Sequence, residues 1–166
     1  MTIISKKARV QMINSNRTKV LYFITLFVLF IMAELFLSNT LVSFMKEGLT
    51  FDSPIFKLHY LENTGAAFNI FKDAREILII FASSVITLIF VYVRNHLSNL
   101  SANALFWIAM LCAGTFGNLH ERISIGCVRD FFELTCINFP VFNISDIMIN
   151  VSVVVLIAMV IFQRSK

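Results

Sequence analysis

Sequence markers of several common enzyme classes are absent from this chain of 166 residues. It contains no Gly-x-Ser-x-Gly, the turn that exposes the nucleophile of many serine hydrolases. Its five glycines form no glycine-rich phosphate loop. His120–Glu121 begins a His-Glu-x-x-His pattern of zinc proteases, but the position of the second histidine is Ser124. Serine-hydrolase, phosphate-loop and zinc-protease chemistry therefore lack support in the sequence.

Cysteine is scarce, and its three positions have no Cys-x-x-Cys spacing. A metal site made of Cys127, Cys136, His120 and Asp130 is therefore disfavoured. A disulfide between Cys127 and Cys136 is chemically allowed outside the cytoplasm. It would tighten the chain around Asp130, so we expect both thiols to be free. Cys112 lies inside an apolar segment and is expected to contribute to packing.

Charged residues make up 14% of the chain, against 58% hydrophobic residues, and the net charge is +4. This positive charge does not indicate nucleic-acid binding, because the basic residues flank apolar runs and form no separate patch. They lie before the first run (Lys6, Lys7, Arg9, Arg17 and Lys19) and after the last (Arg164 and Lys166). We therefore predict a membrane protein with no nucleic-acid partner.

The hydrophobic residues gather in four segments, at about Val20 to Met45, Ile77 to Val93, Ala104 to Phe116 and Ile147 to Phe162. A helix needs ~20 apolar residues to cross the hydrocarbon layer, and the third segment is short unless it extends through Leu119. The segments predict an all-α membrane protein, a four-transmembrane-helix bundle forming a single integral membrane domain over residues 1–166. The basic N-terminus predicts that both termini are cytoplasmic and that the two longer loops face outward.

The first apolar segment is interpreted as a retained span. Its apolar stretch exceeds the 7–15 residues of a usual signal-peptide core, and no convincing cleavage site follows it. Glu34 lies near its middle. A carboxylate at mid-span costs ~2.5–3.5 kcal/mol on insertion scales, so we expect Glu34 to contact the polar site or a partner span and not lipid.

The first outward loop is expected to carry a small extracytoplasmic β-like element. Residues Lys57–Leu61 alternate in the manner of a strand, which favours a short strand or hairpin on the membrane surface. Asn63 and the small residues after it, including Gly65, permit close approach of another backbone. A short amphipathic helix is expected near Phe68–Ile77.

Ionisable and amide side chains are concentrated in the stretch from Gly114 to Asp146. Such groups are costly at a membrane edge, so their clustering indicates a functional site. Asp130 and Asp146 each lie among large apolar residues, where burial and a nearby like charge raise a carboxyl pKa. Two neighbouring carboxyls can share a proton and act as acid and base in peptide hydrolysis.

Four motifs stand in order along the chain: Asn63-Thr-Gly-Ala-Ala-Phe68, Gly117-Asn-Leu-His-Glu-Arg122, Val128-Arg-Asp-Phe131 and Phe142-Asn-Ile-Ser-Asp146. In this order and at about this spacing, they resemble the motifs of the lipoprotein signal peptidases. These type II signal peptidases are bacterial membrane aspartyl proteases. The resemblance covers most of the chain, roughly from the first span to the last.

The resemblance implies that Asp130 and Asp146 are the catalytic pair. It also implies that polar residues line and order the site, and with the neighbouring Gly65, Glu34 and Glu121 the supporting set is Asn63, Gly65, Asn118, Arg122, Asn143, Glu34 and Glu121. Family members cut diacylglyceryl-modified prolipoproteins just before the lipidated cysteine. They do so near the outer face of the cytoplasmic (inner) membrane, without metal or organic cofactor. The expected partners are these substrates and membrane lipid, and the expected state is a monomer.

This chain departs from the family pattern at several supporting positions. Glu121 stands where the family usually has Asp, and Glu34 and Ser38 stand where the first span usually carries Asp and Lys. Ser145 replaces the more usual Ala. An inactive family member that binds lipoproteins without cutting them therefore stays an alternative. Another is a small proton- or solute-coupled transporter using Glu34 and the aspartates, although the halves show no repeat.

Overall fold

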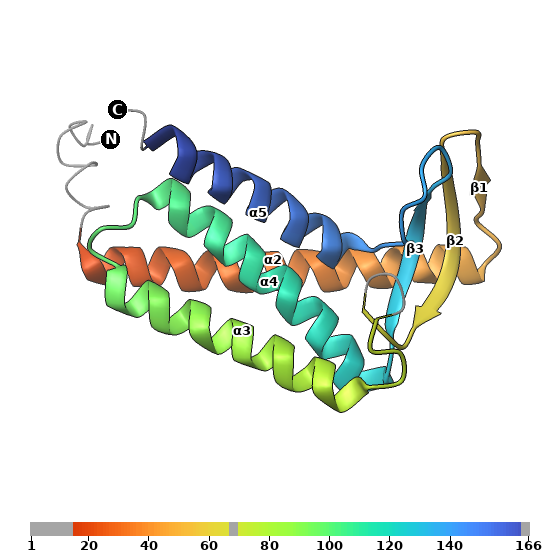
Figure 1. The fold of residues 1–166 in the computed structure, drawn as a ribbon, viewed down its shortest axis with the longest axis horizontal. Helices are drawn as coiled ribbons and strands as arrows, with labels where there is room; N and C mark the ends of the chain where they lie inside the picture. Colours follow the sequence, from red (N-terminus) through yellow and green to blue (C-terminus); the bar gives the residue numbers. More distant parts are fainter. Residues whose placement is uncertain (1–14, 67–69, 164–166) are drawn as a thin grey trace, which may run out of the picture.

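The computed structural model describes residues 15–66 and 70–163. Within these ranges, four helices are long and apolar enough to cross a membrane: α2 (Asn16–Lys46), α3 (Arg75–His96), α4 (Ala102–Ile125) and α5 (Ile144–Gln163). They form a bundle with a small sheet at one end (Figure 1). At the opposite end, α2 begins, α5 ends and the short connection joins α3 to α4. The predicted four-helix membrane fold is confirmed.

The third span is longer than the sequence indicated. We expected it to end at Phe116 or Leu119, but α4 continues to Ile125 and so carries the Asn118–Arg122 motif on a helix. Gly126 ends the helix with φ 87°, a left-handed conformation that glycine adopts without steric cost. The chain can therefore reverse sharply and enter a strand two residues later.

The sheet has three antiparallel strands in the order β1 (Phe51–Asp52), β2 (Phe56–Asn63) and β3 (Val128–Leu134). The predicted β-like element of the first loop corresponds to β1 and β2. The sequence predicted no strand at Val128–Phe131, but these residues belong to β3 and this strand pairs with β2. The pairing sets Leu61 opposite Asp130 and Asn63 opposite Val128, so it brings two motifs that are distant in sequence side by side.

The amphipathic helix expected near Phe68–Ile77 is not present as predicted. Residues 67–69 lie outside the described part, Ile70–Asp73 form a turn, and the helix α3 begins at Arg75. Phe71 and Asp73 have positive φ values of 55° and 61°. Such values interrupt a right-handed helix, so the apolar periodicity of this stretch did not produce one.

Helix α4 occupies the centre of the bundle and packs against α2, α3 and α5. Its glycines allow the close approach of α5. A Cβ at Gly114 would lie 2.6 Å from the carbonyl oxygen of Ser145, and one at Gly117 would collide with the Ser145 hydroxyl. Small residues at such helix contacts are typical of membrane bundles, where backbones approach closely. The start of α5 is thereby held against the last turns of α4.

Lys19, near the start of α2, is buried and acts within the fold as well as contributing to the basic flank. Its Nζ donates hydrogen bonds to the carbonyl oxygens of Leu97, Ser98 and Leu100, at 2.8 to 3.2 Å. These carbonyls follow the end of α3, where helical carbonyls lack intrahelical partners and attract cations. The contact fastens α2 to the α3–α4 connection, at the end of the bundle away from the sheet.

Candidate active site

Asp130 lies on β3, the central element of the candidate site. Its side chain is 1% exposed, and both carboxyl oxygens are hydrogen-bonded. Oδ2 accepts from Asn63 Nδ2 at 2.8 Å, and Oδ1 accepts from Asn143 Nδ2 at 2.9 Å. The β2–β3 pairing supplies Asn63, and the loop before α5 supplies Asn143. The carboxyl is therefore held in one orientation by amides from two other parts of the chain.

Asp146 lies in the first turn of α5 and forms a reciprocal cap with Asn143. Asn143 Oδ1 accepts from the Asp146 backbone N–H at 2.9 Å, and Asp146 Oδ2 accepts from the Asn143 backbone N–H at 3.2 Å. This is a capping box, which satisfies backbone donors at a helix start. Asp146 Oδ1 also accepts a hydrogen bond from Asn118 Nδ2 at 2.8 Å. Asp146 thus has a local structural role and one oxygen directed to α4.

Asn143 joins the two carboxylates. Its Nδ2 donates to Asp130 and to Asn118 Oδ1 (3.0 Å), while its backbone and Oδ1 engage Asp146. It is 3% exposed. Both aspartates line one cavity of about 280 Å³, together with Asn63, Asn118 and Arg122. The sequence-predicted catalytic pair and its polar partners therefore meet around a single space.

The electrostatics of this space favour a proton on Asp130. Burial raises the pKa of Asp130 to about 7, and the nearby negative charge of Asp146 raises it further, while the amides of Asn63 and Asn143 lower it in part. At neutral pH the Asp130 carboxyl is therefore present in both its protonated and ionised forms. A group that titrates near the working pH is suited to proton transfer.

Arg122 is fixed on the wall of the cavity by carbonyl groups. Nη2 donates to the Gly65 carbonyl at 2.7 Å, and Nη1 donates to the Asn118 carbonyl at 3.2 Å. Gly65 in turn donates its N–H to Asn63 Oδ1 at 2.9 Å. The Nε of Arg122 is buried and has no hydrogen-bond partner among the described residues. Arg122 thus links the Asn63 turn to α4, while its Nε–H remains without a partner there.

Two buried glutamates do not line the cavity but accept hydrogen bonds from the residues that directly precede the two aspartates. Glu121 accepts from the backbone N–H and Nε of Arg129, both at 2.7 Å. Glu34 Oε1 accepts from Ser145 Oγ at 2.8 Å and from Ser38 Oγ at 2.9 Å. The expected contact of Glu34 with polar residues inside the bundle is therefore present. Both glutamates were expected at the site from the sequence, whereas Arg129 was not expected as the partner of Glu121.

The arrangement is a carboxylate pair with amide and guanidinium neighbours. Over residues 15–66 and 70–163, no group of three or more His, Cys, Asp and Glu side chains is placed to hold a metal ion. Cys112, Cys127 and Cys136 are free thiols. Two carboxyls that share a cavity can divide the roles of acid and base, as in aspartic proteases.

Comparison with known proteins identifies the family. Residues 26–162 match the family described as signal peptidase (SPase) II. The chain is 38% identical over 109 residues to the lipoprotein signal peptidase of Streptococcus pneumoniae, covering 60% of this chain and 65% of that protein. It is 34% identical over 131 residues to the lipoprotein signal peptidase of Microcystis aeruginosa, covering 76% and 83%. The chain belongs to the signal peptidase II family.

Solved structures agree with this membership at the level of the fold. A bacterial membrane enzyme solved by the in meso method is similar with a TM-score of 0.72 and 23% identity, covering 86% of this chain and 89% of that one. A second bacterial membrane enzyme, also solved in meso, gives a TM-score of 0.68 and 24% identity, covering 83% and 91%. The chain is thus a multi-pass membrane protein of the signal peptidase II family.

A prediction concerns Glu34, one of this chain's departures from the usual signal peptidase II pattern. Glu34→Gln should be milder than Glu34→Leu, because the amide oxygen can still accept from Ser145. The leucine leaves two buried hydroxyls without an acceptor, at a cost of about 1–3 kcal/mol each. Thermal unfolding in detergent measures the difference, with Glu47→Gln on the exposed end of α2 as control. Equal losses of stability from the two Glu34 variants would contradict the role of the Ser145 contact.

Proposed function

We propose that this chain is an aspartic endopeptidase that removes signal peptides from diacylglyceryl-modified prolipoproteins, cutting before the lipidated cysteine. The observation that carries the proposal is the placement of Asp130 and Asp146 on one cavity, joined by Asn143. Family membership supports the substrate class, since the relatives are lipoprotein signal peptidases.

The proposed mechanism assigns each group a step. One aspartate is ionised and takes a proton from the attacking water, while the other is protonated and gives its proton to the scissile carbonyl oxygen. The raised pKa of Asp130 suits it to the protonated role at neutral pH. The guanidinium of Arg122, which lines the same cavity, supplies N–H donors to a substrate carbonyl. The two carboxyls titrate as a pair, with apparent pKa values that belong to both.

A cleavage assay tests this function. Detergent-purified protein should release the signal segment from a fluorophore-labelled lipobox peptide whose cysteine carries diacylglycerol. The same peptide without lipid should be a much poorer substrate, because buried acyl chains contribute ~0.8 kcal/mol per CH₂ to binding. A chelator should leave the rate unchanged. Binding without cleavage would identify a lipoprotein-binding protein instead, and proton-coupled uptake in vesicles would identify a transporter.

We also propose that both termini are cytoplasmic and that the sheet end of the bundle, with the active site, faces outward. In a Cys136→Ser background, which removes the exposed native thiol, Asp52→Cys and Asn99→Cys introduce exposed thiols at opposite ends of the bundle. A membrane-impermeant maleimide added to intact cells should label the variant at position 52 and not that at position 99. The reverse pattern would overturn the orientation and the outward placement of the site.

A further inference from the structure

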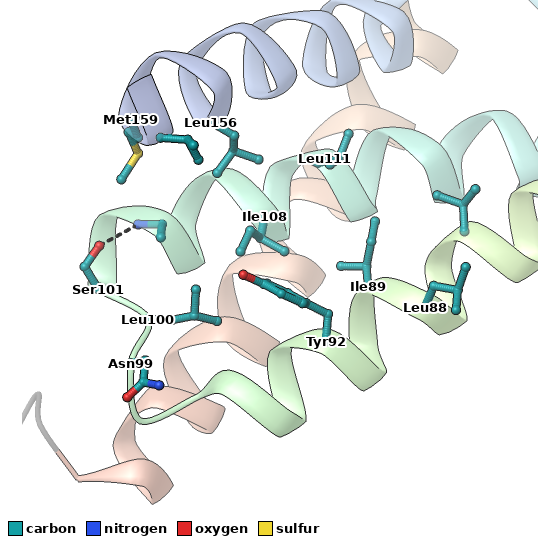
Figure 2. Close-up of a pocket in the computed structure, with 13 residues that line it drawn as sticks. Leu88, Ile89, Tyr92, Asn99, Leu100, Ser101, Ile108, Leu111, Leu156 and Met159 are labelled. Carbon is teal, nitrogen blue, oxygen red and sulfur yellow. Dashed lines mark hydrogen bonds between the residues drawn. The ribbon is translucent and has the colours of Figure 1, made fainter. Parts of the chain in front are cut away.

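Buried carboxyl groups in the described part of the chain gather around the candidate active site. They belong to Glu34, Glu121 and Asp130, and each of the two glutamates accepts a hydrogen bond from the residue that precedes a catalytic aspartate. The pocket at the opposite end of the bundle, between α3, α4 and α5, has no charged side chain in its lining (Figure 2). Buried charge in a membrane protein is costly and usually functional. The proposed mechanism assigns no step to Glu121, so its burial requires another explanation.

Glu121 supports the strand that carries Asp130. This strand, β3, is at one end of the sheet order, so it has only β2 as a neighbouring strand. The N–H of Arg129, directly before Asp130, donates to Glu121 Oε2 at 2.7 Å. The N–H of Phe131, directly after it, donates to the carbonyl of Phe142 at 3.1 Å. Buried peptide N–H groups require such partners. The two peptide groups that flank Asp130 are therefore tied to α4 and to the segment that leads into α5.

The side chain of Arg129 folds back onto the same glutamate. Its Nε donates to Glu121 Oε1 at 2.7 Å, while Oε2 accepts from the backbone N–H of Arg129. Its Nη2 donates to Asn39 Oδ1 on α2 at 3.0 Å. The side chain of Glu121 is 8% exposed and that of Arg129 is 16% exposed. A buried carboxylate keeps its charge only when it is paired and hydrogen-bonded. Arg129 provides both conditions for Glu121.

We propose that Arg129 is a positioning residue for Asp130, because its guanidinium holds Glu121 as the acceptor that fixes the peptide before the catalytic carboxyl. This inference rests on the proposed function. Arg129 does not line the cavity of the aspartate pair, so it acts on the reaction through Asp130 and not through the substrate. Among the described residues, Arg129 forms the only ion pair of Glu121. No other side chain there can therefore replace it in this role.

Loss of the guanidinium weakens the support of Asp130. A buried Glu121 without its cation either takes up a proton or turns away toward water. In both cases the N–H before Asp130 loses a charged acceptor, and hydrogen bonds to charged groups are about twice as strong as neutral ones. The amides of Asn63 and Asn143 still hold the carboxyl oxygens, but the backbone of Asp130 is free to shift relative to Asp146. A displacement of about 1 Å can lower a catalytic rate by roughly 10².

Substitutions at Arg129 test the inference on the diacylglyceryl lipobox peptide, with thermal unfolding to measure the folded fraction. Lys57→Met is the matched control, because it removes an exposed cation, paired with Asp52, from the same sheet. Arg129→Met should lower kcat about tenfold, the effect of a small displacement of Asp130. It should leave KM near that of Lys57→Met, since Arg129 does not contact substrate. Arg129→Lys keeps a positive charge within reach of Glu121 and should retain most of kcat.

Three results would overturn the inference. They are equal kinetics of Arg129→Met and Lys57→Met, a raised KM with unchanged kcat in Arg129→Met, and a kcat of Arg129→Lys as low as that of Arg129→Met. The second would place Arg129 in contact with the substrate. Failure of the unsubstituted protein to cut the peptide would instead refute the proposed function.

If Arg129→Met does not fold, a Glu121→Gln background provides the test. The neutral amide still offers an oxygen to the N–H of Arg129. In this background Arg129→Met should change kcat by less than about twofold, because the guanidinium has no carboxylate left to hold and the two substitutions act on one interaction. A loss of about tenfold there would show that Arg129 acts independently of Glu121 and would overturn the inference. Complete inactivity of Glu121→Gln would do the same, since its amide oxygen can replace the acceptor.

Discussion

Asp130→Asn and Asp146→Asn are each expected to lower the turnover of the lipidated peptide by a factor of 10²–10⁴, the usual worth of a general acid or base. This corresponds to about 3–5.5 kcal/mol of transition-state stabilisation. Asparagine has nearly the same shape as aspartate and keeps one of the two acceptor oxygens, so expression and membrane insertion should persist. Turnover is measured on detergent-purified protein, with folding checked by thermal unfolding.

The double variant should be about as inactive as either single variant, because members of one catalytic unit are strongly non-additive. Glu133→Gln is the control. Glu133 lies on the same strand as Asp130, and its Oε2 lies 3.4 Å from His59 Nδ1. It does not line either of the two cavities that Asp146 lines, so its variant should retain most activity. Substantial turnover by either Asn variant would refute the aspartic mechanism.

The pH dependence follows from the raised pKa of Asp130, which is about 7 in the folded protein. The rate should be bell-shaped in pH, with its alkaline limb near pH 7 as the shared proton is lost. The free energy of unfolding also decreases as the pH rises. The folded state holds the Asp130 proton more tightly than the unfolded state, so the free energy of unfolding falls as pH rises from about 4 to 7. Asp130→Asn should remove that part of the slope.

Asn143→Ser is expected to reduce turnover by about two orders of magnitude while leaving the fold nearly intact. Serine is a good helix N-cap, so the start of α5 keeps its cap. It cannot supply the Nδ2 that donates to Asp130 and Asn118, so the two carboxylates lose their shared amide. Asn143→Ala should lose both functions and about 1 kcal/mol more of stability. Parallel measurement of kcat and unfolding separates the two effects.

Asn103→Ala, at the far end of α4, controls for the loss of an amide elsewhere on the bundle. Its side chain contacts Trp107 and Met159 and lines none of the catalytic cavity. It should leave turnover near that of the unsubstituted protein. If Asn143→Ser keeps full activity, the amide bridge between the carboxylates is not required, and the capping role of Asn143 is sufficient.

The sequence alone determined the features that depend on composition and short-range geometry. Four apolar runs predict four spanning helices, because hydrocarbon accepts only segments whose backbone is satisfied internally. The relation of Asn143 to Asp146 is also local, since a helix start places these two positions within mutual hydrogen-bond reach. The four motifs identified the family resemblance and named both aspartates.

The tertiary structure decided the features that depend on distant partners. Asp130 and its partner Asn63 are 67 residues apart and meet only because β2 pairs with β3. The extension of α4 to Ile125 includes Glu121, which is buried in an ion pair with Arg129. Hydropathy cannot predict such a pair, because it scores each residue without its distant partner. The packing of α3 and α5 against α4, with at most slight contact between α3 and α5 in the described part of the chain, likewise depends on the tertiary structure. Periodicity reports which face of a helix is apolar, whereas packing decides whether that face meets another helix or stays open.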